Sequence, residues 1–538
     1  MARLSITSYL IKEEYYEFRD VIREDIEVEY YQLNEELNLN GIIFVGYTSK
    51  NSPQWLQLLQ SGSNSDLPEL LNSSSRAILF VRSNDRIFAF PFGFGRYLLK
   101  DEAIVKDFGI KVVLNSVDPQ KLRSIDTATI SEMTIHSRTQ TSKTTNVNTF
   151  GIDVVKDFLK SVTGEPTNED FGTIITGRES VQFSYDFEDD FRKFGVICTI
   201  LEEKYNSDSY RENFSWVDNL QIVNDSVLKS ELDQKLIDNI NVREENKLHI
   251  APPEIIDWNN VGGFSFTEHG NKINDLRIEE YFDYITKFDE FDLEKFKRHS
   301  VYTWDNSNDN RVAKWKLYDC VVFETVYEDE IYVLTVGNWF KINHDFANSV
   351  EEYVRNIPTS SIDLPPCKQE EKEGEYNLRV GQEVTNMITL DTKNVMYQGS
   401  KIEICDLMSN EKHLIHVKPW KSSSTLSHLF SQGRVSSESL FQDVDFRKAS
   451  REKISEINEG YVEYISEDHY DPSEIEVVYA IIDSSDRELH ERLPFFSKLN
   501  MMQSVKHLRN IRYHVTQLKI RREIDNNVDA NNEEVAVG

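Results

Sequence analysis

A set of ionisable side chains on helix-like and strand-like segments in the C-terminal part of the chain is suited to metal-assisted hydrolysis. In chain order these residues are Glu375, Glu403, Asp406, His416 and Lys418. Carboxylate oxygens are the ligands that Mg²⁺ prefers, so Asp406, Glu403 and Glu375 are the predicted metal ligands. A bound divalent ion polarises a phosphate and acidifies its water, and a nearby lysine stabilises the charge that develops. These residue types therefore suit metal-assisted chemistry, for which Mg²⁺ or Mn²⁺ is the expected cofactor.

The elements that must position these side chains alternate between helix and strand. Glu375 opens a helix-like stretch, and Gly433 is the expected C-terminal stop of a second helix. The three candidate strands, the second helix and the last strand are 387–390, 401–408, 414–418, 424–432 and 475–482. His416 and Lys418 lie two residues apart, so they share one face of the third strand. The predicted order is α-β-β-β-α-β.

That order, with these polar residues, resembles the core of the restriction-endonuclease-like phosphodiesterases (PD-(D/E)XK type). In that superfamily an acid lies on the second core strand, which matches Asp406. An acid-x-Lys triplet lies on the third strand, where this chain has His416, Val417 and Lys418. The resemblance implies that Glu375 is the helix acid, that Lys418 supports the attacking water and that His416 is an auxiliary ligand or base.

Histidine stands where the superfamily usually has a carboxylate. Imidazole is a poor ligand for Mg²⁺ and a better one for softer divalent metals. Two interpretations follow from this departure at His416. Either the metal is bound by Asp406, Glu403 or Glu375, or the site has lost hydrolysis.

Two further segments are candidates for contact with a nucleic-acid backbone. The residues Ser422, Ser423 and Ser424 precede the second helix, whose first N–H groups point toward a bound phosphate. The segment 505–523 is rich in lysine and arginine, and on a helix Lys506, Arg509 and Arg512 lie along one side. A solvated helix face that pairs with acids elsewhere is an equally good explanation of this basic segment.

A second resemblance extends over nearly the whole chain. It rests on blocks such as 92–99 (FGFGRYLL), 251–254 (APPE) and 422–433 (SSSTLSHLFSQG). Together they look like a sporadically distributed, uncharacterised bacterial family met near mobile and phage-defence genes. The resemblance implies a defence context and assigns no catalytic residue.

Composition limits the other classes of function. The chain has 538 residues, of which 11% are aromatic, so it is predicted to be a folded, multidomain α/β (α+β) protein. Its formal net charge of -32 predicts that it repels polyanions except at local basic sites. The four cysteines form no CxxC pair, which argues against structural zinc and a disulfide framework. No apolar run approaches the length of a membrane span, so we expect a cytoplasmic location without membrane contact.

Breaks in pattern suggest the domain organisation. The predicted parts are 1–133 (α/β), 150–246 (mainly helical), 247–359 (β-rich), 374–523 (nuclease-like) and 524–538 (a disordered acidic tail). The Ser/Thr/Asn-rich segment 134–149 is predicted to be an exposed loop, and 154–162 and 226–240 are predicted helices.

Two functions fit the sequence. One is a metal-dependent nuclease of bacterial anti-phage defence. The other is a non-catalytic module that senses nucleic acid or a phage protein and works with a partner. Self-association and a defence partner protein are open under both hypotheses.

Overall fold

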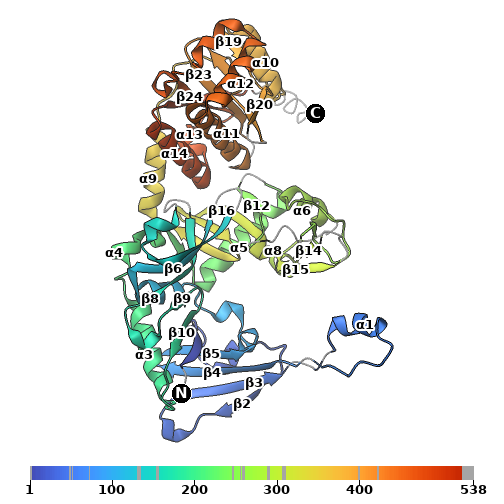
Figure 1. Ribbon diagram of the computed structural model, residues 1–538, viewed down its shortest axis with the longest axis vertical. Coiled ribbons are helices and arrows are strands. Elements are labelled where there is room, and N and C mark those ends of the chain that lie inside the picture. The colour runs from blue at the N-terminus through green and yellow to red at the C-terminus, as the bar shows by residue number, and fades with distance from the viewer. Residues whose placement is uncertain are drawn as a thin grey trace, which may run out of the picture. The chain divides into compact units, whose positions relative to one another are not determined.

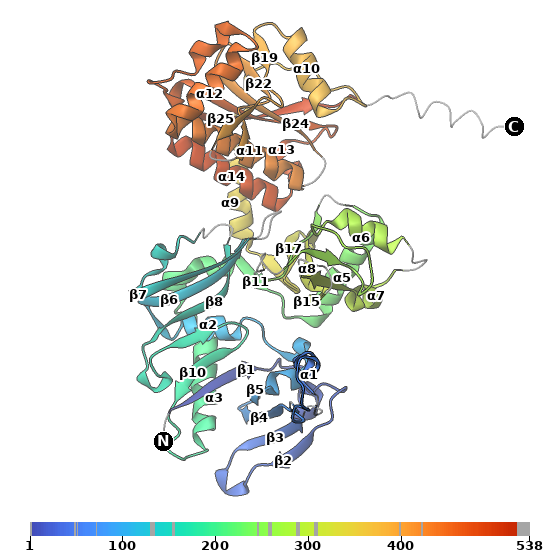
Figure 2. The same cartoon turned by 45° about the vertical axis from the view of Figure 1, so that its right-hand side comes forward.

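The computed structural model of the protein describes residues 3–47, 50, 52–71, 73–129, 135–152, 157–244, 247–254, 256, 261–286, 291–305, 310–397, 400–420 and 423–523. Two compact units divide the chain, with the boundary at Ser226 (Figures 1 and 2). Both units combine helices and sheets, so the predicted mixed α/β, multidomain class is confirmed. The finer domain boundaries stay predictions. None of the described helices is both long and apolar enough to cross a bilayer.

The first unit is built on a ten-stranded sheet in the order β2-β3-β4-β5-β1-β10-β9-β8-β6-β7. Its strands and β11 are β1 (Leu4–Leu10), β2 (Glu29–Gln32), β3 (Asn40–Tyr47), β4 (Ser75–Ser83), β5 (Arg86–Gly93), β6 (Val117–Thr129), β7 (Ile135–Thr145), β8 (Asp157–Pro166), β9 (Ile175–Gly177), β10 (Val181–Tyr185) and β11 (Leu220–Ile222). Its helices are α1 (Gln54–Ser61), α2 (Phe108–Leu114), α3 (Lys193–Asn206) and α4 (Arg211–Phe214). Apolar residues of α2 and α3 pack with those of the strands in one core.

Two sequence-based assignments in this unit are wrong. The Ser/Thr-rich segment predicted as a loop contains β7, an edge strand that pairs antiparallel with β6. The segment predicted as a helix at 154–162 overlaps β8, which pairs with β6 and β9. In both segments pairing with β6 decides the backbone conformation, and local propensity does not.

The second unit begins with a β-rich part. Its strands are β12 (Leu248–Ile250), β13 (Gly263–Ser265), β14 (Ser300–Trp304), β15 (Arg311–Lys316), β16 (Val321–Tyr327), β17 (Glu330–Thr335) and β18 (Asn338–Ile342). Its helices are α5 (Ser226–Asn241), α6 (Ile278–Ile285), α7 (Leu293–Arg298), α8 (Leu317–Cys320) and α9 (His344–Arg355). The predicted helix at 226–240 is thus confirmed as α5, and β16, β17 and β18 form an antiparallel meander.

The C-terminal part of this unit carries the candidate site. Its elements are α10 (Glu373–Glu383), β19 (Met387–Thr389), β20 (Asn394–Tyr397), β21 (Ser400–Glu403), β22 (Leu407–Ser409), β23 (His413–Pro419), α11 (Ser423–Gln442), α12 (Val444–Ser455), β24 (Glu476–Asp483), α13 (Leu489–Arg492), α14 (Phe495–Asn510) and β25 (His514–Arg521). The main sheet runs β19-β22-β23-β24-β25. The β19-β22 and β22-β23 pairs are antiparallel, whereas β23-β24 and β24-β25 are parallel.

Helices cover both faces of this sheet. Tyr376 and Val380 of α10 pack with Val417 and Val478 on one face. Residues of α11, α12 and α14 pack with Leu414 and its neighbours on the other. The two clusters follow the strict alternation of side chains along β23, so each residue of this strand is assigned to a face by its parity.

Three expectations for this part are corrected. The single strand expected at 401–408 is two strands, because β21 pairs with β20 in a hairpin and β22 belongs to the main sheet. Helix α11 continues through Gly433, where a Cβ atom would lie 2.6 Å from Tyr479 and 3.1 Å from His416, so the glycine allows close packing and does not end the helix. The basic segment 505–523 is not one helix, because α14 ends at Asn510 and β25 occupies His514–Arg521.

Candidate metal centre

Three carboxylates converge at one edge of the main sheet. Asp391 follows β19, Glu403 ends β21 and Asp406 precedes β22. Each offers an oxygen, and these three oxygens all lie within 4.8 Å of one another. The backbone brings them together because the N–H groups of Leu390 and Asp391 both donate to the carbonyl of Asp406, at 2.8 and 3.1 Å. We call Asp391, Glu403 and Asp406 the acidic triad.

Neighbouring groups fix the orientation of these carboxylates. The backbone N–H of Val417 donates to Asp406 Oδ2 at 2.7 Å. The side-chain amide of Asn377, on α10, donates to Asp391 at 3.2 Å and to Asp406 at 3.5 Å. On the other side, Gln432 of α11 donates to Glu403 at 2.5 Å. The triad is therefore held by groups from both helical layers and from β23.

The electrostatics of the triad favour the uptake of a cation. Asp406 is fully buried, and this burial, with the nearby charge of Glu403, raises its pKa to about 8 although the Val417 N–H opposes the shift. Burial likewise raises the pKa of Glu403. Two buried amide oxygens, Asn377 Oδ1 and Gln432 Oε1, have no hydrogen-bond partner within the described part of the chain. A divalent ion suits such a site, since it compensates the carboxylates and prefers oxygen ligands.

Lys418 is the basic group associated with this centre. Its Nζ donates to the carboxylate of Glu373 at the start of α10, and its side chain is only 18% exposed. Burial alone would lower the pKa of Lys418, but the ion pair with Glu373 and the charges of Asp406 and Glu403 outweigh it and raise the pKa. The ammonium group therefore stays charged near neutral pH.

Glu375 and His416, the other two predicted catalytic residues, are not among the side chains whose ligand atoms converge in the triad. Glu375 is exposed, and its carboxylate accepts a hydrogen bond from the backbone N–H of Lys372 at 3.0 Å, within the first turn of α10. His416 is fully buried beneath α11, and in the described part of the chain neither ring nitrogen has a hydrogen-bond partner. Burial lowers the pKa of His416 to about 3, so its ring is neutral. Neither residue belongs to the triad.

Sequence reasoning selected Asp406 and Glu403 but missed Asp391 and Glu373. An available signal for Asp391 was its position directly after a short apolar strand. Glu373 lies two residues before the acid that was selected, so the choice depended on where α10 begins.

The predicted backbone-binding residues are dispersed. Ser422 lies outside the described residues, and Ser423 and Ser424 begin α11. Lys506 is on α14, where its Nζ lies 4.9 Å from the centre of the Tyr353 ring. Arg509 is on the same helix, whereas Arg512 lies in the turn before β25, so the three residues do not share one helix.

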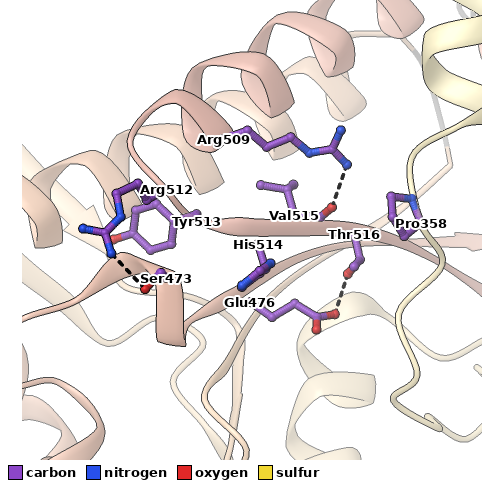
Figure 3. Close-up of a pocket in the computed structure, with 9 residues that line it drawn as sticks. All are labelled: Pro358, Ser473, Glu476, Arg509, Arg512, Tyr513, His514, Val515 and Thr516. Atoms are coloured by element: carbon purple, nitrogen blue, oxygen red, sulfur yellow. Dashed lines mark hydrogen bonds between the residues drawn. The ribbon is translucent and has the colours of Figure 1, made fainter.

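Arg509 and Arg512 line an open pocket of about 620 Å³ (Figure 3). Arg512 donates to Asp471 and to Ser473, each at 3.2 Å, and Arg509 donates to the carbonyl of Val515 at 3.3 Å. The pocket also contains Glu476, at the amino end of β24. Because β24 and β23 are parallel, this pocket and Lys418 lie toward opposite ends of the strands.

Comparison with known proteins identifies the family. The model of a family described as "Family of unknown function (DUF6119)" matches residues 6–521. The chain belongs to this family. Neither the curated proteins nor the solved structures include a match to the chain. The family description assigns no residue roles.

The geometry of the centre offers a cation three carboxylates from the DUF6119 chain, with a charged lysine beside them. An all-oxygen ligand set of this kind suits a hard divalent cation. Asn377 and Gln432 would orient the carboxylates, and their unpartnered oxygens add polar groups near the ion. The residues present therefore fit a divalent metal.

Proposed function

We propose that the protein is a metal-dependent phosphodiesterase that hydrolyses nucleic acid in bacterial defence against phage. The acidic triad beside Lys418 carries this proposal. The order of α10, β19, β22, β23, α11 and β24, with two antiparallel pairs followed by a parallel one, supports a restriction-endonuclease-like core. The defence setting rests on the resemblance of the sequence alone.

Each residue of the centre has a role in this proposal. Asp391, Glu403 and Asp406 hold the metal, which when bound polarises the scissile phosphate and lowers the pKa of a water molecule. Lys418 supplies a fixed positive charge where negative charge develops on the phosphate. Glu373 holds the lysine in place through their ion pair.

The alternative is a non-catalytic sensor of nucleic acid or a phage protein. One observation favours it, namely that the charge of Lys418 is already compensated by Glu373. A sensor would keep the metal site and nucleic-acid binding but would release no cleaved product.

Cleavage assays separate the two functions. Single- and double-stranded DNA and RNA are incubated with the full chain and Mg²⁺ or Mn²⁺, and the products are separated by size. We expect cleavage that EDTA, Asp406→Ala and Lys418→Ala each abolish. The matched control is Lys412→Ala, which removes a lysine paired with Glu474 just before the opposite end of β23 and should retain activity.

Equal product from wild type and both centre variants would refute catalysis at this site. Binding without cleavage under any divalent metal would favour the sensor.

A further inference from the structure

A second polar cluster lies at the carboxyl ends of the parallel strands, outside the metal centre. It consists of Trp420, Asp483, Arg492 and Lys519. Trp420 follows β23, and its backbone N–H donates to the carbonyl of Ile482 on β24 at 2.8 Å. Asp483 ends β24. In open sheets with parallel strands, ligands bind outside these carboxyl ends. Trp420 is two residues from Lys418, a separation of roughly 7 Å at most along the chain.

Two neighbours in this cluster position Arg492 without using the hydrogen-bond donors of its guanidinium. Its guanidinium carbon lies 4.9 Å from the centre of the Trp420 ring, which is a cation–π contact. Its Nε lies 3.7 Å from Asp483 Oδ1, and 38% of the arginine side chain is exposed. Among the described contacts, the guanidinium of Arg492 donates no hydrogen bond. The group is thus positioned by two neighbours while its donors remain available.

Asp483 is an unusual neighbour because it is almost fully buried, with 2% exposure. Its Oδ2 has no hydrogen-bond partner among the described residues and lies 3.7 Å from Lys519 Nζ. Lys519 itself donates to the carbonyls of Ser485 and Arg487, so it is anchored to the loop after β24. The buried carboxylate therefore lies near two cations, of which only Arg492 is free to bind something else.

Trp420 adds a second unpartnered group. Its indole Nε1 is buried, and within the described residues it finds no acceptor. A buried donor without a partner costs free energy unless a ligand or water supplies the acceptor. A negatively charged ligand would pair with the exposed part of the Arg492 guanidinium.

We propose that Arg492 is a phosphate-binding residue that contacts the nucleic-acid backbone next to the metal centre, with Trp420 and Asp483 as its positioning residues. A planar guanidinium presents paired N–H groups that match two phosphate oxygens. The stacking on Trp420 and the attraction of Asp483 reduce the freedom that the side chain would lose on binding. This inference rests on the proposed function, because it names a contact of the same substrate.

Binding of nucleic acid in the absence of cleavage tests the proposal. A fluorescein-labelled single strand of DNA is titrated with the full chain in EDTA, and anisotropy is followed over a series of salt concentrations. A hydrogen bond to a charged group contributes about 1.5–3 kcal/mol, so Arg492→Ala should weaken binding roughly ten- to a hundredfold. The slope of log K against log salt should become shallower by about 0.7, the value for one phosphate contact on a single strand.

Two further variants distinguish positioning from charge. Arg492→Lys should restore the salt slope but not the full affinity, because lysine keeps the charge and loses the planar fork. Asp483→Asn should weaken binding with an unchanged slope, although it removes a negative charge. If Asp483 acted only through its charge, this variant would bind more tightly. The matched control is Arg298→Ala on α7, an arginine that is 77% exposed and pairs only one turn away with Glu294.

The outcomes separate this inference from the function on which it rests. Weaker binding by Arg492→Ala supports it even if no cleavage is ever seen. Wild-type affinity and salt slope in Arg492→Ala, or tighter binding by Asp483→Asn, would overturn it, including in a protein that cleaves nucleic acid. Cleavage by the wild type, measured in parallel with Mn²⁺, reports separately on the metal centre.

Discussion

Replacement of Asp406 by asparagine should stabilise the metal-free protein at alkaline pH while it removes one carboxylate of the candidate metal centre. Asparagine imitates the protonated carboxyl group in shape and hydrogen bonding but has no proton to lose. In the native protein Asp406 stays protonated up to a pKa of about 8, whereas an unfolded aspartate ionises near 3.8. Between these values the native state holds a proton that the unfolded state has released, so the free energy of unfolding falls as the pH rises.

The magnitude follows from the same two pKa values. At about 1.4 kcal/mol per tenfold change, a rise from 3.8 to about 8 corresponds to roughly 6 kcal/mol. Entry of water and relaxation around the ionised group reduce this figure, and we expect about 2–4 kcal/mol above pH 8. Asp406→Asn should therefore match wild type near pH 4 and exceed it in stability by that amount at pH 9.

Hydrogen exchange followed by mass spectrometry measures this effect where it arises. Peptides that span β22 and β23 report the opening free energy of the main sheet separately from that of the other unit. The measurement is made in EDTA and then with Mn²⁺. A concentration of Mn²⁺ one hundred times its Kd should stabilise wild type by about 2.7 kcal/mol and leave Asp406→Asn unchanged.

Two results would refute this reasoning. In EDTA at pH 9, a variant less stable than wild type would show that the Asp406 carboxylate is well accommodated without metal. Equal stabilisation of both proteins by Mn²⁺ would place the ion elsewhere. Because the metal must displace the Asp406 proton, its apparent affinity should also fall by up to tenfold per pH unit below pH 8.

Two further substitutions test the packing beneath the centre. Gly433→Ala places a Cβ atom 2.6 Å from Tyr479 and 3.1 Å from His416, so we expect a loss of about 1–3 kcal/mol of unfolding free energy in urea denaturation; unchanged stability would contradict the close approach of α11. His416→Leu removes two buried nitrogens without partners, so stability should be retained or rise by about 1 kcal/mol, with unchanged Mn²⁺ binding in calorimetry. The gain in stability of His416→Leu over wild type should grow below pH 6.5, because histidine binds a proton in the unfolded state but not in the buried ring, whose pKa is about 3. Loss of Mn²⁺ affinity in this variant would restore His416 as a ligand.

Local patterns in the sequence predicted several elements whose partners are adjacent in the chain. The helix predicted at 226–240 is the clearest case, because α5 (Ser226–Asn241) is held by hydrogen bonds between residues four apart in the chain. Strands β7 and β8 were missed for the opposite reason. Their composition favours loop and helix, and the pairing that makes them strands involves β6 and β9, which no local window contains.

The same limit explains why Asp391 of the acidic triad was missed. The hairpin of β20 and β21 inserts between Asp391 and Glu403, so the two acids are twelve residues apart in the chain yet converge in space. The single strand expected over 401–408 contained no such hairpin, so nothing in the prediction placed Asp391 near Glu403. The hydrogen bonds from Leu390 and Asp391 to Asp406 join residues that are far apart in the chain, so the spacing of residues in the sequence does not predict them.

The basic residues show how a correct composition can lead to the wrong surface. A helix over 505–523 would have aligned Lys506, Arg509 and Arg512, but the alternation of β25 gives Lys519 the same register row as Lys418, two strands away. Neighbouring strands lie about 4.8 Å apart, so the backbones of these two lysines are roughly 10 Å from each other. Lys418 and Lys519 therefore lie toward the carboxyl ends of the strands, where Arg492 is also held beside Asp483. The number of basic residues along the chain could not distinguish the carboxyl ends of the strands from the pocket of Arg509 and Arg512. The direction of the strands places the two sites at opposite ends of the sheet.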